Sequence, residues 1–137
     1  MIAFDTNILI YACDKADPKR QKVAIDLLSN VGDGVRLWQV ACEFVAASRK
    51  LKSQGFTTVD AWDRLADYRA LFPLILPEAG AVERARILHL KDGWSFWDAM
   101  IVAACLECGA TRLYSEDLPG CAVRWPLEIV NPFLQLG

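Results

Sequence analysis

The chain begins with Ile2-Ala3-Phe4-Asp5-Thr6-Asn7, in which three apolar residues give way to polar residues that favour turns and helix caps. This change predicts a buried strand whose carboxyl end lies at Asp5. Other short apolar runs predict further strands at 35–38, 74–76, 112–114 and 127–130, and helical patterns lie at 23–28, 40–52, 57–71, 78–90 and 95–108. Alternating strands and helices predict an α/β fold with a central, mainly parallel sheet flanked by helices.

The length and composition indicate one domain. With 137 residues, 54% of them hydrophobic, the chain can bury one substantial core but is too short for two ordinary domains. We therefore expect a single domain over residues 1–137. The first residues bring a carboxylate at position 5 instead of a basic region and a long apolar stretch, which argues against a secretory signal. The apolar run 99–106 is too short to span a bilayer, and we expect a cytoplasmic protein with no membrane partner.

The cysteines do not predict a disulfide framework. There are five, an odd number, at positions 13, 42, 105, 108 and 121, and at least three lie in apolar segments where a reduced thiol behaves as a small hydrophobe. Cys105 and Cys108 have the spacing of metal ligands. A second pair is absent from the sequence and His89 is its single histidine, so a four-ligand zinc site is not expected.

Four carboxylates adjoin apolar sequence, where an unpartnered acid is costly: Asp5, Glu43, Asp98 and Asp117. This pattern predicts one shared site for a divalent metal ion. On a helix, the neighbours of Glu43 are mostly small and apolar, unlike those of a solvated acid. Asp5 and Asp117 each follow a predicted strand, and ligands gather at the carboxyl ends of parallel strands.

Each acid also has a structural explanation. Asp5 alone could cap the first helix or form an Asx turn. Asp98 follows Ser95 with the spacing of a capping box, a role compatible with metal binding because the helix N-terminus keeps the acid ionised. Asp117 could belong to a turn, and Glu116 could take its place as a ligand. The sequence alone does not choose between these two neighbours.

The types of residue available narrow the chemistry. His89 has no evident partner, which makes a Ser or Cys triad an unfavourable interpretation. Oxygen ligands suit Mg²⁺ or Mn²⁺ and therefore metal-assisted phosphoryl transfer. Basic residues cluster at Lys15, Lys19, Arg20 and Lys22, and again at Arg49, Lys50 and Lys52. A solvated helix surface is the simpler interpretation of both clusters, and a rim that guides phosphates is the alternative.

The order of these motifs resembles the PIN domains, and within them the VapC-type ribonuclease toxins of toxin–antitoxin pairs. Residues 2–11, Glu43, residues 94–99 and residues 113–118 are similar to the family's four motifs. The resemblance implies a three-layer α/β/α fold and an endoribonuclease with Mg²⁺ or Mn²⁺ on Asp5, Glu43, Asp98 and Asp117. It assigns supporting roles to Thr6, Asn7, Ser115 and Glu116, and gives Arg49, Lys50 and Lys52 a tentative role in binding RNA.

The same resemblance implies a cognate antitoxin as partner and a homodimer, for which residues 68–72 and the helix through Leu88 are reasonable surfaces. The tryptophans at 38, 62, 94 and 97 are expected to pack in the core or a dimer interface and are not assigned to RNA. Three alternatives remain: a noncatalytic PIN-like module, a DNA nuclease, and a metal-dependent phosphatase. The phosphatase is disfavoured because Asn7 occupies the position where such enzymes commonly need a second acid.

Overall fold

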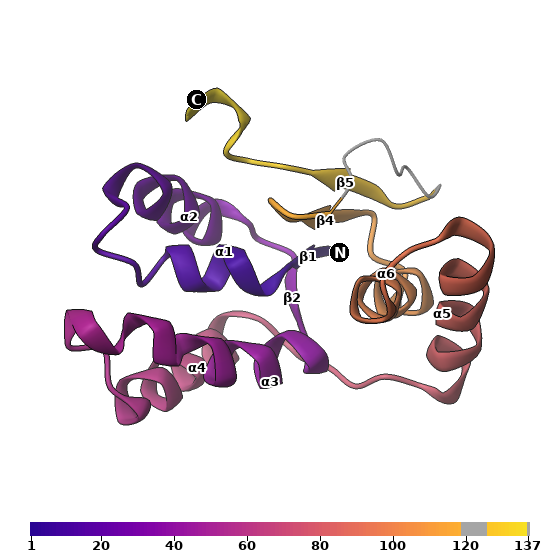
Figure 1. Cartoon of the computed structure of the whole chain (residues 1–137), viewed down its shortest axis with the longest axis horizontal. Coiled ribbons are helices and arrows are strands. Elements are labelled where there is room, and N and C mark those ends of the chain that lie inside the picture. The colour runs from indigo at the N-terminus through magenta and orange to yellow at the C-terminus, as the bar shows by residue number, and fades with distance from the viewer. Residues whose placement is uncertain (119–125, 137) are drawn as a thin grey trace.

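The computed structural model of the chain describes residues 1–118 and 126–136 and contains one five-stranded sheet with the order β3-β2-β1-β4-β5 (Figure 1). All four neighbouring pairs are parallel. The strands are β1 (Ile2–Phe4), β2 (Gly34–Leu37), β3 (Leu74–Ile75), β4 (Arg112–Tyr114) and β5 (Glu128–Val130). Every strand predicted from the sequence is confirmed, and β1 occupies the centre of the sheet.

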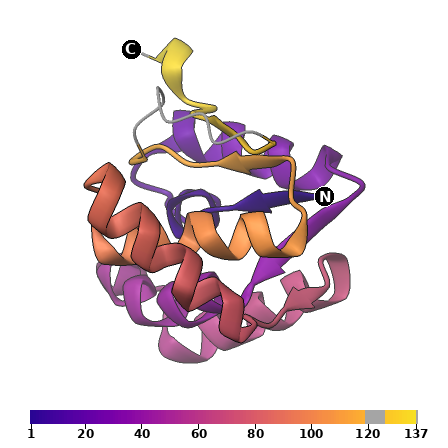
Figure 2. The ribbon, with the colours of Figure 1, turned by 90° about the vertical axis from the view of Figure 1, so that its right-hand side faces the viewer.

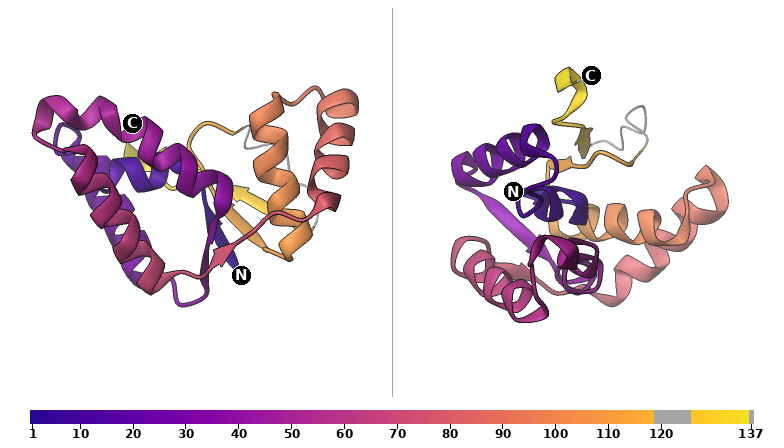
Figure 3. Two further views of the ribbon diagram at one scale, coloured as in Figure 1. Left: turned by 90° about the horizontal axis from the view of Figure 1, so that it is seen from below. Right: turned by 60° about the vertical axis from the view of Figure 1, so that its left-hand side comes forward.

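Helices cover the sheet on both sides, which confirms the three-layer α/β/α arrangement. Figure 1 shows the first four helices on one side of the strands and the last two on the other. In Figure 2 the fifth helix (red) crosses in front of the sixth (orange), and both lie in front of the strands. Figure 3 shows the two helical groups diverging around the sheet. The helices are α1 (Thr6–Tyr11), α2 (Pro18–Asn30), α3 (Trp38–Ala47), α4 (Thr58–Leu71), α5 (Ala79–Asp92) and α6 (Phe96–Cys108), with 3₁₀ turns η1 (Ser48–Gln54) and η2 (Leu134–Leu136).

Local capping chemistry sets several helix boundaries. Thr57 accepts a hydrogen bond from the backbone N–H of Asp60, and the Asp60 carboxylate accepts one from the backbone N–H of Thr57, a complete capping box at the start of α4. Ser95 caps α6 by accepting from the backbone N–H of Asp98. Gly93 and Gly109 end α5 and α6 with φ of 70° and 79°, a left-handed conformation that favours glycine.

The region from Trp38 to Gln54 differs from its sequence prediction. Trp38 was expected to end a strand, but β2 ends at Leu37 and Trp38 begins α3. All of β2 is buried, whereas 49% of the Trp38 surface is exposed. The helix predicted for 40–52 also ends early at Ala47, and η1 continues the chain. A short apolar run does not distinguish the last residue of a strand from the first of a helix.

Burial varies along the regions expected to form a dimer surface. Tyr68, Phe72 and Leu88 are buried in the hydrophobic core with exposed fractions of 5%, 3% and 5%, whereas Leu71 and Leu90 in the same regions are exposed. The dimer surface stays a prediction. Of the four tryptophans considered, Trp94 lies in the core. Trp38, Trp62 and Trp97 lie outside it and are exposed to solvent.

Among residues 1–118 and 126–136, no helix is both long enough and apolar enough to cross a bilayer.

Candidate active site

Asp5 lies at the junction of β1 and α1, where the central strand β1 and its neighbour β4 end together. Its backbone N–H donates to the carbonyl of Tyr114 over 2.8 Å, which continues the pairing of β1 with β4. Its carboxylate accepts from the backbone N–H of Thr6 and from the Ser115 hydroxyl, each over 2.7 Å. Asp5 caps α1, as its simpler interpretation predicted, but this role leaves the carboxylate at the wall of a pocket.

Burial dominates the ionisation of Asp5. Its side chain is 7% exposed, and this desolvation raises the pKa from 3.8 to about 6. The hydrogen bonds from Ser115 and Thr6 lower the pKa, while the negative charges of Glu43 and Asp117 raise it further. The acid is thus held in its charged form only at a cost, which a nearby cation would reduce.

Glu43 reaches the same region from the middle of α3. The Thr6 hydroxyl donates to Glu43 Oε2 over 3.0 Å, and Gln39 Nε2 donates to Glu43 Oε1 over 2.6 Å. Thr6 therefore contacts Asp5 through its backbone and Glu43 through its side chain. The two donors fix the Glu43 carboxylate plane while leaving lone pairs on both oxygens.

Asp117 follows β4 and is held by Asn7. The Asn7 amide Nδ2 donates to Asp117 Oδ2 over 3.1 Å, and the Glu116 backbone N–H donates to Asn7 Oδ1 over 3.5 Å. The Glu116 side chain turns to other partners: it accepts from the Tyr11 hydroxyl over 2.6 Å and from Arg20 Nε over 2.7 Å. Of the two neighbouring acids, Asp117 lines the pocket, and Glu116 belongs to the ion pair that supports it.

The Arg20 side chain is engaged on several sides, which changes the interpretation of the first basic cluster. Besides Glu116, its guanidinium pairs with Asp17 over 3.2 Å and lies 5.6 Å from the ring centroid of Tyr11 and 5.7 Å from that of Phe133. These contacts join α1, α2, the segment after β4 and the segment after β5. Arg20 is therefore paired within the protein, although 30% of its side chain remains exposed.

Asp98 occupies the first turn of α6, on the opposite wall from α1. It is half-buried, and its backbone N–H lies 3.4 Å from the Ser95 hydroxyl that caps the helix. The positive end of the helix dipole favours the ionised carboxylate here. Asp98 lies in the pocket wall together with Ile101, which is three positions further along α6.

The four acids line one pocket of about 470 Å³, although they come from four separate segments of the chain. Thr6 and Asn7 also line it, together with Ile10, Tyr11, Asp14, Ala47, Lys50, Trp97 and Ile101. Sequence reasoning missed Tyr11 and Asp14. Helical spacing from Asn7 could have indicated Tyr11, whereas Asp14 lies beyond the end of α1. Lys50 is the cation among the described lining residues, whereas Arg49 and Lys52 are exposed on η1 outside this lining.

The donor set is compatible with a hard divalent ion. All four acids, and the neighbouring hydroxyl and amide groups, offer oxygen, which Mg²⁺ and Mn²⁺ prefer. Within residues 1–118 and 126–136, no three His, Cys, Asp or Glu side chains are gathered closely enough to hold one ion jointly as they stand. Mg²⁺ usually binds only one or two protein carboxylates and retains several waters. Acids that lie too far apart to bind one ion all at once are therefore still compatible with Mg²⁺.

The thiols and the histidine lie apart from this pocket. Cys105 is fully buried, and burial raises the pKa of its thiol. The Cys108 thiol lies 3.5 Å from the Cys105 carbonyl, to which it donates, and His89 Nδ1 is 2.6 Å from the carbonyl of Trp94. Each of these groups has a structural contact. Cys121 lies outside the described residues.

Comparison with solved structures shows similarity along nearly the whole chain. A toxin–antitoxin complex from Klebsiella pneumoniae has a TM-score of 0.69 at 19% identity, with 96% of this chain and 98% of that chain covered. The Mycobacterium tuberculosis toxin VapC20, which cleaves the sarcin–ricin loop, has a TM-score of 0.66 at 20% identity, with 85% and 90% covered. VapBC2 from Rickettsia felis, bound to a DNA fragment from its promoter, has a TM-score of 0.68 at 18% identity, with 96% and 98% covered.

At these identities the likeness establishes a shared fold. A search among curated proteins found no match to the sequence. A sequence model of the PIN domain, in contrast, matches residues 2–118, which include β1 to β4, α1 to α6 and all four acids of the pocket. The chain belongs to the PIN domain family.

Proposed function

We propose that this protein is a metal-dependent endoribonuclease, the toxin of a toxin–antitoxin pair, which hydrolyses RNA phosphodiester bonds. The observation that carries the proposal is the convergence of Asp5, Glu43, Asp98 and Asp117 on one pocket. Membership of the PIN domain family supports a nuclease, and similarity in fold to an RNA-cleaving toxin supports RNA as the substrate. Such an enzyme meets its substrate in the cytoplasm.

The four acids would hold Mg²⁺ or Mn²⁺ in this proposal. A divalent ion supplies Lewis acidity there, which neutralises phosphate charge and lowers the pKa of an attacking water. Ser115 and Thr6 orient the Asp5 carboxylate, and Thr6 and Gln39 orient that of Glu43. These bonds keep the carboxylates in place before a substrate arrives, so little reorganisation is needed during the reaction.

Charge at the pocket also bears on RNA binding. A set of acids repels a polyanionic backbone unless cations offset it. Lys50 lines the pocket and is the best-placed residue for a phosphate contact, while Arg49 and Lys52 would act only at its outer margin. The proposed partners are therefore an RNA substrate and, from the two toxin–antitoxin structures with the same fold, a cognate antitoxin. A homodimer remains part of the proposal.

The test is cleavage of total cellular RNA by purified protein freed of any antitoxin. The reaction is run with Mn²⁺ or Mg²⁺ and with EDTA, for the wild type and for Asp98→Asn. Asp26→Asn is a matched control, because Asp26 is an exposed acid of α2 that pairs with Lys22 outside the pocket. We expect discrete fragments that require both metal and Asp98. Cleavage that persists in EDTA or in Asp98→Asn would contradict the proposal.

A further inference from the structure

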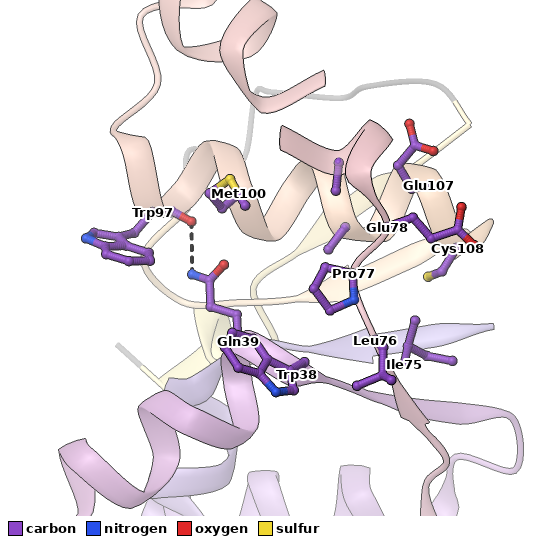
Figure 4. Close-up of a pocket in the computed structure, with 12 residues that line it drawn as sticks. Trp38, Gln39, Ile75, Leu76, Pro77, Glu78, Trp97, Met100, Glu107 and Cys108 are labelled. Atoms are coloured by element: carbon purple, nitrogen blue, oxygen red, sulfur yellow. Dashed lines mark hydrogen bonds between the residues drawn. The ribbon is translucent and has the colours of Figure 1, made fainter. Parts of the chain in front are cut away.

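Gln39 makes two hydrogen bonds that join different walls of the acidic pocket. It lies in the first turn of α3, one helical turn before Glu43. Its amide Nε2 donates to Glu43 Oε1 over 2.6 Å and to the backbone carbonyl of Trp97 over 3.2 Å. Figure 4 shows the amide directed at that carbonyl, away from Trp38 and Leu76 on the other side of the side chain. Trp97 immediately precedes Asp98 in the first turns of α6.

The chemistry of the two partners fixes the amide orientation. A carboxylate oxygen and a peptide carbonyl both accept hydrogen bonds and do not donate them. The amide nitrogen has two N–H groups, one for each partner, whereas the amide oxygen in the same place would be repelled by both. Gln39 can therefore satisfy the site in one orientation only. A glutamate or a hydrocarbon side chain of similar length would satisfy neither partner.

These bonds complete a continuous chain through the pocket. From the Trp97 carbonyl the chain runs through Gln39 to Glu43, from Glu43 to the Thr6 hydroxyl, and from the Thr6 backbone N–H to Asp5. The Ser115 hydroxyl then joins Asp5 to the segment after β4. The described helix α6 packs mainly against α5, on the far side from α3. Gln39 thus links the wall that carries Asp98 to the walls that carry Glu43 and Asp5.

We propose that Gln39 is a positioning residue that sets the Glu43 carboxylate relative to the first turn of α6 and so raises the affinity of the pocket for Mg²⁺ or Mn²⁺. This inference rests on the proposed function, in which the acids hold a divalent ion. Gln39 acts through Glu43 and the α6 backbone and does not itself touch the ion. Residues that orient metal ligands commonly contribute about 10- to 100-fold to metal affinity.

If Gln39 contributed to folding alone, replacing it would change the packing and stability of the protein and leave the metal affinity unchanged. Gln39 is half-buried and lies outside the hydrophobic core, at the edge of an apolar pocket of about 140 Å³ lined by Trp38, Leu76 and Met100. Replacing it with methionine keeps the length and the contact with these apolar groups, and removes both N–H donors. The change in metal affinity can therefore be separated from a loss of packing.

The experiment measures Mn²⁺ affinity by isothermal titration calorimetry on the full chain, well below its melting temperature. The variants are Gln39→Met and Gln39→Asn, whose shorter amide cannot reach both partners. Gln21→Met is the matched control, because Gln21 donates one amide hydrogen bond to the Ala12 carbonyl and does not line the acidic pocket. Circular dichroism follows the fold of each variant.

We expect Gln39→Met to bind Mn²⁺ about 10- to 100-fold more weakly, with an unchanged circular dichroism spectrum, while Gln21→Met binds as the wild type does. If Gln39→Met does not fold, Gln39→Asn decides: weakened binding supports the inference and wild-type affinity overturns it. Wild-type affinity in a folded Gln39→Met overturns the role of Gln39 and leaves the proposed function standing. A wild type that binds no Mn²⁺ overturns both.

Discussion

Replacing Asp5 with asparagine should stabilise the metal-free protein at neutral pH, even though it removes a proposed metal ligand. The Asp5 carboxylate is almost fully buried beside Glu43 and Asp117, and burial raises its pKa to about 6. Above that pH the folded protein must keep the acid ionised in surroundings that disfavour the charge. Asparagine is nearly the same size and neutral. Its carbonyl oxygen can accept from Thr6 N–H, and its amide can donate to the Ser115 hydroxyl.

The size of the effect follows from the pKa. A rise from 3.8 to about 6 in the folded state corresponds to about 3 kcal/mol, at about 1.4 kcal/mol for each pKa unit. This is an upper limit for the gain at pH 7.5, because asparagine reproduces the hydrogen bonds to Thr6 and Ser115 imperfectly. Each 1 kcal/mol of added stability raises the melting temperature of a domain this size by about 3–5 °C.

The sign of the pH dependence is opposite to that of an acid in a salt bridge. Between pH 4 and 6 the folded wild type binds a proton at Asp5 that the unfolded chain has released, so protonation favours the folded state. Wild-type stability therefore falls as the pH rises through this window. Above about pH 6 the full destabilisation by the ionised Asp5 is present. Asp5→Asn lacks this contribution, so the advantage of the variant should grow from near zero at pH 4 to its maximum above pH 6.5.

The assay is thermal unfolding followed by circular dichroism in EDTA from pH 4 to 8, on the wild type and Asp5→Asn. Asp26→Asn serves as the control, because it removes an exposed acid. Saturating Mn²⁺ should then stabilise the wild type by mass action and narrow or reverse the difference. The reasoning fails if Asp5→Asn is less stable than the wild type in EDTA by the same amount at pH 4.5 and pH 7.5.

Two further predictions concern cations near the pocket. Lys50→Met should weaken RNA binding and reduce its salt dependence more than Lys52→Met does, because only Lys50 lines the pocket; equal effects in a salt titration would argue against this difference. Arg20→Gln should reduce kcat/KM on a defined RNA several-fold, because it removes the partner of Glu116 next to a proposed ligand. Arg84→Gln breaks an ion pair of the same length, between α5 and Glu107 of α6, and should leave the rate unchanged.

Sequence reasoning succeeded where the controlling interactions are local. The capping box of Thr57 and Asp60 lies within four consecutive residues, and Ser95 caps α6 through a residue three positions away. The alternation of short apolar runs with helical patterns was enough to predict a parallel sheet covered on both faces. Each of these features is encoded in a few neighbouring residues.

The choice between Glu116 and Asp117 could not be made in this way. Neighbouring residues after a strand point in different directions, and the partners that distinguish these two come from α1 and α2. Arg20, the ion-pair partner of Glu116, lies 96 positions away in the sequence. For the same reason the sequence does not separate Arg20, which pairs with Glu116, from the other basic residues between Lys15 and Lys22.

The tryptophans show a second limit. A large aromatic residue at helical spacing predicts burial on average, and Trp94 follows this expectation at 8% exposed. Trp97, three positions later in the first turn of α6, is 64% exposed at the rim of the pocket. Burial depends on which neighbouring elements cover a helix, and residue type and periodicity do not specify that arrangement.

The central position of β1 has a consequence for when the pocket can exist. Asp5 is among the first residues of the chain, but Ser115, which donates to its carboxylate, is 110 positions later. β1 pairs with β4 only after α5 and α6 have been synthesised, because both precede β4 in the chain. A nascent chain that stops within α5 has Asp5 and Glu43 but lacks Asp98 and Asp117. Translation products that end before Asp117 therefore lack at least one acid of the four-acid pocket.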